Sequence, residues 1–279
     1  MTPQNKTEKK CMELTMLGTG NALVTKCYNT CYVINGDGGS ILVDGGGGNA
    51  LFPQLEKAGI DWMDLRDIFV THKHLDHIMG IIWMIRMICQ HMKQGEYEGE
   101  ASIYAHDEVI DILRSAAGRL LPEKHVRFMD DRLHMVTLRD GETRTIAGRE
   151  FTFFDIHSTK AKQYGYCLDL GEGRKLTCCG DEPCGDSCRG LAKDSDWLLH
   201  EAFCLDGEAD IFHPYEKHHS TVKDACELAE ELRIKDLLLY HTEDTHLPER
   251  KELYLAEGRR YFHGNIHIPD DLEKIVIPG

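Results

Sequence analysis

The residues most capable of chemistry in this chain gather in one short segment, Thr71–His77, which reads Thr-His-Lys-His-Leu-Asp-His. The segment follows an apolar run that we expect to be a strand. A bend at the end of that strand could turn the imidazoles of His72 and His74 toward one cation. Asp76 and His77 offer a carboxylate and a further imidazole one turn later. These residue types in this order predict a metal-binding loop.

The four potential ligands fall within six residues and would crowd a single ion. We therefore expect two ions, with His72 and His74 on the first and Asp76 and His77 on the second. Such ions would lie about 3.5 to 4 Å apart and hold a bridging hydroxide. The plainer interpretation is a solvated turn rich in histidine, but the density of ligands between a strand and an apolar segment favours the metal site.

Short apolar runs separated by turn signals supply the elements that must position this loop. The runs and their periodicity predict strands at Met12–Leu17, Cys31–Ile34, Ser40–Val43, Ile68–Val70, Ser102–Ala105, Phe151–Ile156, Tyr164–Leu168, Lys175–Cys179 and Asp236–Tyr240, and helices at Asn49–Ala58, Ile78–Met92, Glu108–Leu121 and Val222–Leu232. Strands and helices therefore mix along the whole chain.

The pattern His-x-His-x-Asp-His resembles the signature of the metallo-β-lactamase superfamily. That resemblance implies an α+β four-layer αβ/βα sandwich, and it implies further ligands from a His, a bridging Asp and a last His, each at the end of a later strand. His157, Asp181 and His241 each end an apolar run and match these positions. Asp44 matches a strand-ending Asp that, in the superfamily, accepts the other N–H of a ligand histidine.

The resemblance assigns the ligands to two divalent ions. Zinc is the expected metal, with manganese or iron as alternatives. The first ion would be held by His72, His74 and His157, the second by Asp76, His77 and His241, and Asp181 would bridge the two.

Two further motifs resemble the RNase Z branch of the superfamily. His200-Glu201-Ala202-Phe203 is similar to its His-Glu-Ala-Thr motif, with Phe in place of Thr, and His219-Ser220-Thr221 is similar to its His-Ser-Thr motif. The resemblance implies that Glu201 orients His219, which protonates the leaving oxygen. Two nearby histidines that could take the same role are His213 and His218.

These motifs favour a metal-dependent phosphodiesterase in which Asp76 orients or deprotonates the bridging hydroxide. The same metal site hydrolyses lactones, thioesters or β-lactams in other branches, and Glu201 and His219 would then be bystanders. An oxidoreductase of the flavodiiron kind is disfavoured because that branch replaces the second histidine with Glu, whereas this chain keeps His74. A scaffold with a degenerate site would lack ligands, and none is missing.

The substrate is expected to be a small phosphodiester or an RNA 3′ end. The tRNA-processing members carry a long basic arm between the third ligand and the bridging Asp, but here only 23 residues separate His157 from Asp181. They contain one short basic cluster, Lys160 and Lys162. The formal net charge of −15 also argues against nonspecific binding of nucleic acid.

Composition is consistent with one large folded unit. With 279 residues, 42% hydrophobic and 28% charged, the chain can bury a sizeable core, and we expect a single domain over residues 1–279, with a homodimer as one option for its assembly. No apolar run approaches a membrane span, and Met1–Lys10 lacks the apolar core of a signal peptide. Eleven cysteines, an odd number, fit reduced thiols in a cytoplasmic protein.

Several other cysteines and histidines have weaker interpretations. Cys178, Cys179, Cys184 and Cys188 fall within eleven residues and could form a separate zinc site. Their spacing lacks paired Cys-x-x-Cys knuckles, so plain burial or adventitious binding is favoured. The three histidines without an evident ligand partner are expected at the surface: His106, His125 and His134.

Overall fold

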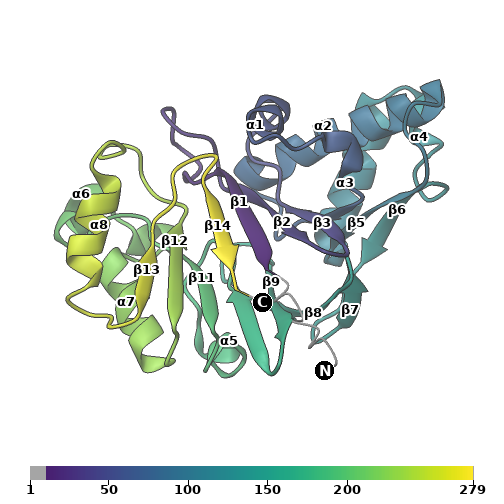
Figure 1. Cartoon of the computed structure of the whole chain (residues 1–279). Helices are drawn as coiled ribbons and strands as arrows, with labels where there is room; N and C mark the ends of the chain where they lie inside the picture. Colours follow the sequence, from purple (N-terminus) through teal and green to yellow (C-terminus); the bar gives the residue numbers. More distant parts are fainter. Residues whose placement is uncertain (1–10, 279) are drawn as a thin grey trace, which may run out of the picture.

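The computed structural model describes residues 11–278, which form two seven-stranded sheets (Figure 1). The first sheet contains, in spatial order, β14 (Lys274–Ile277), β1 (Met12–Gly18), β2 (Cys31–Gly36), β3 (Gly39–Val43), β4 (Asp67–Phe69), β5 (Ala101–Ala105) and β6 (Leu133–Thr137). The second contains β13 (Asn265–His267), β12 (Asp236–Tyr240), β11 (Trp197–Glu201), β10 (Arg174–Cys178), β9 (Tyr164–Gly171), β8 (Arg149–Asp155) and β7 (Thr143–Ile146).

Each sheet has an antiparallel part and a parallel part. In the first sheet, β14, β1, β2 and β3 pair antiparallel, and β3 to β6 run parallel. In the second sheet, β7 to β10 pair antiparallel, and β10 to β13 run parallel. Because parallel strands share a direction, the residues that follow β3 and β4, and those that follow β10 and β12, can meet where the two sheets adjoin.

Helices cover the outer face of each sheet. Those of the first half are α1 (Leu51–Lys57), α2 (Leu75–Gln94), α3 (Asp107–Leu120) and α4 (Glu123–Val126), and those of the second half are α5 (Asp186–Ala192), α6 (Ala209–Phe212), α7 (Val222–Glu231) and α8 (Arg250–Gly258). Short 3₁₀ turns lie at Trp62–Asp64, Asp206–Glu208 and Tyr215–Lys217. Figure 1 shows the two groups of helices at opposite sides of the molecule.

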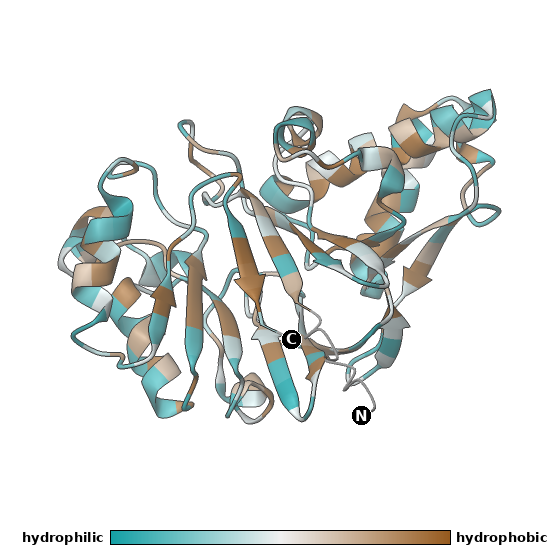
Figure 2. Cartoon of the chain, viewed as in Figure 1, coloured by the Kyte–Doolittle hydropathy of each residue, from teal (hydrophilic) through white to brown (hydrophobic). Residues whose placement is uncertain are grey.

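Three apolar clusters join these layers. One lies between the first sheet and α1 to α3, a second lies between the two sheets, and a third lies between the second sheet and α5, α7 and α8. Figure 2 shows hydrophobic residues alternating with hydrophilic ones along the strands and helices. The order helix, sheet, sheet, helix confirms the four-layer αβ/βα architecture predicted from the sequence.

Local sequence explains where the elements nearest the site begin and end. Helix α2 begins at Leu75, directly after His74, and ends at Gly95, whose left-handed φ of 78° suits glycine. Helix α7 begins with a reciprocal capping box between Thr221 and Asp224. Both helix starts therefore fix the backbone of residues predicted to be functional.

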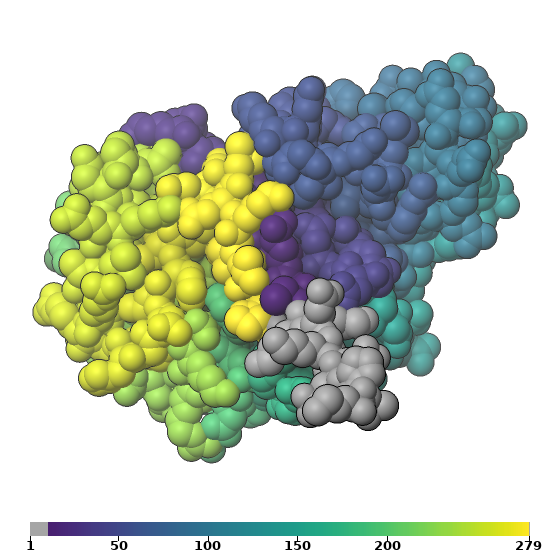
Figure 3. Space-filling view, in the orientation of Figure 1, coloured from purple at the N-terminus to yellow at the C-terminus, as the bar shows by residue number. Residues whose placement is uncertain are grey.

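The C-terminal part of the fold was not predicted. Helix α8 and strands β13 and β14 follow His241, and β14 returns to pair with β1 at the far end of the sequence. Figure 3 shows this C-terminal segment, in yellow, against the purple N-terminal strand. Pairing between the two ends of a chain depends on tertiary packing, which a short apolar run such as Lys274–Ile277 does not reveal by itself.

Some predictions lie beyond what the fold tests. Within residues 11–278, no helix is long and apolar enough to cross a membrane. The prediction about Met1–Lys10 falls outside the described residues. The single domain, the homodimer and the cytoplasmic location stay predictions.

Candidate metal centre

The predicted ligands come from strand ends in both sheets. The loop after β4 carries His72 and His74, and the first turn of α2 carries Asp76 and His77. Asp181 follows β10 and His241 follows β12. The fold brings these distant segments together at one place, where the two sheets adjoin.

The first group contains His72, His74 and Asp181. His72 Nε2 lies 2.8 Å from His74 Nδ1 and 3.4 Å from Asp181 Oδ2. One ligand atom of each residue lies within 4.8 Å of the other two. His72 and Asp181 are buried, but His74 is only partly buried, so this group has an open side.

The second group contains Asp76, His77 and His241, and all three are buried. Asp76 Oδ2 lies 3.3 Å from His77 Nε2 and 3.4 Å from His241 Nε2. Asp181 Oδ2 lies 3.6 Å from each of the same two nitrogens. Asp181 therefore faces both groups, as a bridging carboxylate would.

Asp44 supports the loop from behind. Its Oδ2 lies 2.7 Å from His77 Nδ1 and accepts a 2.7 Å hydrogen bond from the Thr71 hydroxyl. Its Oδ1 accepts a 2.8 Å hydrogen bond from the Thr71 backbone N–H. The contact expected between Asp44 and a ligand histidine is present, and it turns His77 Nε2 toward the site.

A close approach of two glycines holds α2 against the segment after β3. A Cβ on Gly80 would meet the Gly45 backbone oxygen at 1.9 Å, and the Gly45 N–H donates a 2.8 Å hydrogen bond to the His77 carbonyl. Only glycine permits this approach. The Gly-rich stretch after Asp44 thus positions the ligand loop, and its spacing is not that of a phosphate-binding motif.

Gln163 is a site residue that the sequence did not reveal. Its side-chain amide donates a 2.7 Å hydrogen bond to Asp181 Oδ1 and lies 3.4 Å from His72 Nδ1. It is buried and sits just before β9, outside any motif. Gln163 fixes the oxygen of Asp181 that does not face the second group.

The electrostatics of these side chains fit a group that binds cations. Although burial raises it, the neighbouring imidazoles of His72, His77 and His241 hold the pKa of Asp181 well below its usual range. Burial and the neighbouring His72 lower the pKa of His74 to about 4. Deprotonated carboxylates beside a neutral imidazole are the protonation states that metal ligands need.

An unpartnered atom points to the same conclusion. His77 Nε2 is buried without a hydrogen-bond partner, although such atoms usually have one. It faces carboxylate oxygens of Asp76 and Asp181. A nitrogen and oxygen donor set of this kind fits Zn²⁺, Mn²⁺ or Fe.

His157 lies apart from both groups. It follows β8 with a left-handed φ of 56°, its backbone N–H donates to Asp155 Oδ1 at 2.7 Å, and its side chain is exposed. Among residues 11–278, neither group includes it. Its role as third ligand of the first ion stays a prediction.

Glu201 and His219 form a buried pair beside the second group. Glu201 Oε2 lies 3.6 Å from His219 Nδ1, while Glu201 Oε1 accepts hydrogen bonds from the Ser220 backbone N–H at 2.6 Å and hydroxyl at 2.5 Å. The His219 ring lies 5.0 Å from that of His241. Burial raises the pKa of Glu201 well above its usual value, and burial with His241 lowers that of His219 to about 3, so both directions favour an uncharged pair.

Phe203 explains the departure from the branch motif. Its ring stacks on that of His219, with the ring centres 4.9 Å apart and an angle of 14° between the planes. Lys217 Nζ lies 4.8 Å from the centre of the Phe203 ring. Phe203 is itself buried. An aromatic ring at this position adds to the desolvation of His219.

The alternatives to His219 are less well placed. The side chain of His213 is 55% exposed. His218 Nδ1 lies 3.1 Å from the Thr159 hydroxyl, and its backbone is left-handed with φ of 61°. His219 is the one of the three that is buried against a candidate ligand.

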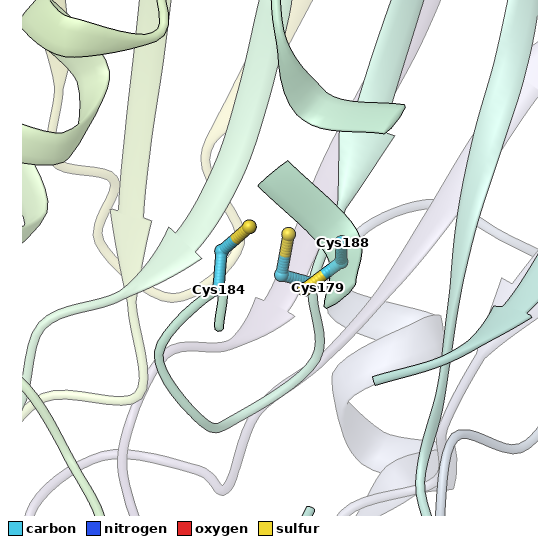
Figure 4. A group of neighbouring side chains, drawn as sticks. All are labelled: Cys179, Cys184 and Cys188. Carbon is cyan, nitrogen blue, oxygen red and sulfur yellow. The ribbon is translucent and has the colours of Figure 1, made fainter. Parts of the chain in front are cut away.

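The cysteines divide into two sets. Cys178 lies between the sheets, where its Sγ accepts a hydrogen bond from Tyr32 Oη at 3.2 Å. Figure 4 shows Cys179, Cys184 and Cys188 turned toward one another, and their sulfurs all lie within 4.8 Å. Three of the four cysteines grouped in the sequence therefore form a real cluster.

Two histidines were placed wrongly from the sequence. His106 and His125 were expected at the surface, but His106 is 0% exposed and His125 is 6% exposed. His106 lies between β5 and α3, and its ring packs 5.3 Å from that of Tyr164 on the second sheet. His125 is buried within α4. His134 is half-buried and pairs with Glu100 at 3.0 Å.

The chain resembles known proteins along nearly its whole length. The family model described as Anti-Pycsar protein Apyc1 matches residues 12–261. Ribonuclease Z of Thermobifida fusca (strain YX) is 26% identical over 308 aligned residues, covering 96% of this chain and 95% of that protein.

Solved structures share the fold. The metallo-β-lactamase fold protein YhfI from Bacillus subtilis matches with a TM-score of 0.74 and 19% identity, covering 96% of this chain and 100% of that one. A diphosphatase from the PhnP family matches with a TM-score of 0.72 and 19% identity, covering 96% of this chain and 97% of that one.

Proposed function

This chain belongs to the Anti-Pycsar protein Apyc1 family and is an RNase Z-like metallo-hydrolase of the metallo-β-lactamase superfamily; on that basis we propose that it hydrolyses small phosphodiesters at a dinuclear metal centre. The observation that carries the proposal is the position of Asp181. Its Oδ2 faces His72 at 3.4 Å and both His77 and His241 at 3.6 Å, so one carboxylate serves two groups of ligands.

We assign the first ion to His72, His74 and Asp181, joined by His157, and the second to Asp76, His77, His241 and Asp181. When bound, a pair of divalent cations, with zinc as the expected metal, would supply Lewis-acid activation of the phosphoryl group and of the attacking water at neutral pH.

Side chains of the protein orient the nucleophile and the metal ligands in this proposal. Asp76 is buried between the rings of His77 and His241, and it orients the attacking nucleophile or accepts its proton. Asp44 keeps His77 Nδ1 engaged, which leaves Nε2 free for the site.

His219 protonates the leaving alkoxide in this proposal. Its ring lies beside that of His241, a member of the second group of ligands. Glu201 Oε2 lies 3.6 Å from its Nδ1. Ser220 anchors Glu201 through Oε1. A proton given up through Nε2 can then be replaced at Nδ1 from Glu201.

The chain between the third proposed ligand and Asp181 supports a small substrate. The 23 residues between His157 and Asp181 are occupied by β9, β10 and their short flanking loops, which leaves no length for a separate tRNA-gripping arm. Lys160 and Lys162 are the basic residues of the first of these loops, and both already have partners, Lys217 O and Asp107.

The second candidate function is hydrolysis of a lactone, thioester or β-lactam at the same ligands. The buried contact between Glu201 and His219 favours the phosphodiesterase, because those reactions have no need of this pair.

A substrate panel tests the proposal. Chelator-treated protein, before and after reloading with zinc, would be assayed with bis(p-nitrophenyl) phosphate, a 3′,5′-cyclic nucleotide, a dinucleotide, a lactone, a thioester and a chromogenic β-lactam. We expect metal-dependent cleavage of the phosphodiesters. Cleavage of the carboxylic esters or β-lactam alone would overturn the assignment.

A further inference from the structure

A second kind of donor cluster lies behind the candidate metal centre. Cys179, Cys184 and Cys188 are all buried, and their sulfurs lie within 4.8 Å of one another (Figure 4). They come from three different places: the end of β10, the loop after it, and helix α5. Among residues 11–278, this is the one group of cysteines close enough to share an ion.

Ordinary burial of thiols does not explain this convergence. Other buried cysteines stand apart from any such group, as small apolar side chains do: Cys89 lies in the core beside the first sheet, and Cys226 lies in the same core as the cluster but outside it. The sulfurs of Cys184 and Cys188 lie 3.9 and 3.3 Å from the Gly185 carbonyl oxygen, and the three thiols also interact with one another. A single disulfide would use two of the three thiols and leave the third without a partner.

A buried imidazole lies next to the cluster. His200 is 1% exposed, and its Nδ1 lies 2.7 Å from the Glu201 carbonyl, so Nδ1 must donate and Nε2 carries the lone pair. That lone pair accepts the Cys184 backbone N–H at 3.1 Å, so His200 lies beside the loop that holds the thiols and can donate to an ion once this hydrogen bond is released. Three thiolates and one imidazole form the donor set of structural zinc sites.

We propose that Cys179, Cys184 and Cys188 bind a structural zinc ion, separate from the dinuclear centre, with His200 as the fourth donor. The sequence spacing argued against such a site because it lacks a Cys-x-x-Cys knuckle. The turn into α5 supplies the geometry instead, since it carries Cys188 back toward the end of β10.

The position of this site indicates a structural role for the ion. Cys179 stands two residues before Asp181 and Cys184 three residues after it, so one ion would clamp both ends of the segment that carries the shared carboxylate. His200 precedes Glu201 on β11. The zinc would therefore fix the backbone of two residues of the proposed active site without contacting substrate.

X-ray absorption at the zinc edge tests the proposal on the full chain. The ligands proposed for the active site offer only nitrogen and oxygen, so scattering from sulfur at about 2.3 Å would report the cysteine site alone. We expect this signal in the wild-type protein. Its absence from zinc-loaded wild-type protein would overturn the proposal, whether or not the phosphodiesterase assignment holds.

Metal content in two matched variants completes the test. We expect about three zinc ions per chain in the wild type and about two in Cys188→Ser, with the sulfur signal lost. Cys226→Ser removes a buried thiol from the same core and should keep three ions and the signal. Equal metal content in all three proteins would contradict the proposal, and the wild-type spectrum decides the matter if Cys188→Ser does not fold.

Discussion

The two groups of candidate ligands share Asp181 but differ in how firmly they are held. In the second group Asp76, His77 and His241 are all buried, and Asp44 fixes His77 from behind at 2.7 Å. In the first group His74 is partly buried, and His157, the remaining predicted ligand, is exposed. The donors of the second group therefore already face one another, whereas the first group would gain its predicted third histidine only if the His157 side chain turned inward.

This difference matters for chemistry. A preformed, water-excluded site holds an ion tightly, and an open one leaves room for an incoming substrate. We infer that the second ion is the more firmly bound and that the first lies on the side from which substrate approaches.

The largest effect should come from removing the ligand that both groups share. Asp181→Ala should lower the occupancy of both ions, and activity should fall by at least about 10³-fold because the cations contribute several kcal/mol to transition-state stabilisation. Elemental analysis and phosphodiester assays would measure both effects. Glu182→Ala, next in sequence and also buried, is the matched control and should keep both ions. Two tightly bound ions in Asp181→Ala would show that this residue is not the bridge.

The next effect separates proton delivery from metal binding. His219→Ala should slow hydrolysis of an alkyl phosphodiester by roughly 10² to 10⁴, the usual worth of general acid catalysis, and slow a nitrophenyl phosphodiester much less, because nitrophenolate leaves without a proton. Metal content should not change. Steady-state rates on the two substrates provide the measurement.

Two companion variants sharpen this test. Glu201→Gln should show the same dependence on leaving group in milder form, since it removes the group that orients the imidazole and replaces its proton but leaves His219 itself in place. His218→Ala should have little effect. An equal fall for both substrates in His219→Ala, with both ions retained, would mean that His219 positions substrate and that another group is the acid.

A smaller effect should distinguish the two metal positions. Asp44→Asn removes the charge behind His77 and should weaken the second ion by roughly 10 to 100-fold, the usual cost of losing such a supporting contact. His157→Ala should instead weaken the first ion. Competition with a chelator of known affinity, monitored in each variant, would measure the two constants. If Asp44→Asn and His157→Ala both lose the same ion first, the proposed division of the ligands between the two ions is wrong.

The smallest expected difference concerns substrate size. A small phosphodiester should be cleaved at a rate comparable to or better than a precursor tRNA, because gripping tRNA needs a basic surface that binds in a salt-sensitive way. Rates on both substrates at two salt concentrations would measure this. A strong preference for precursor tRNA would exclude the small-substrate proposal.

Much of this site was predictable because a His or Asp directly after an apolar run can be recognised in the sequence. Asp44, Asp181 and His241 all follow strands, and the structure brings them together. Gln163 could not be found in this way, since it lies in a loop and its value comes only from the hydrogen bond to Asp181. The burial of His106 likewise depends on Tyr164 from the other sheet.

The cysteine cluster shows a different limit of sequence reasoning. Spacing rules for structural zinc describe knuckles made within one turn, whereas Cys179 and Cys188 meet because α5 folds back on the end of β10. The pairing of β14 with β1 is also a contact between segments far apart in the sequence. In each case the contact is created by tertiary packing, which leaves no local periodic pattern.

The number of ions that activity requires tests the central claim most directly. Metal-free Cys188→Ser protein, in which the proposed cysteine site has lost one of its thiols, would be titrated with zinc while hydrolysis of bis(p-nitrophenyl) phosphate is followed. The account predicts little activity after the first equivalent and a rise that ends at the second. Full activity without added metal, or with one equivalent, would contradict it.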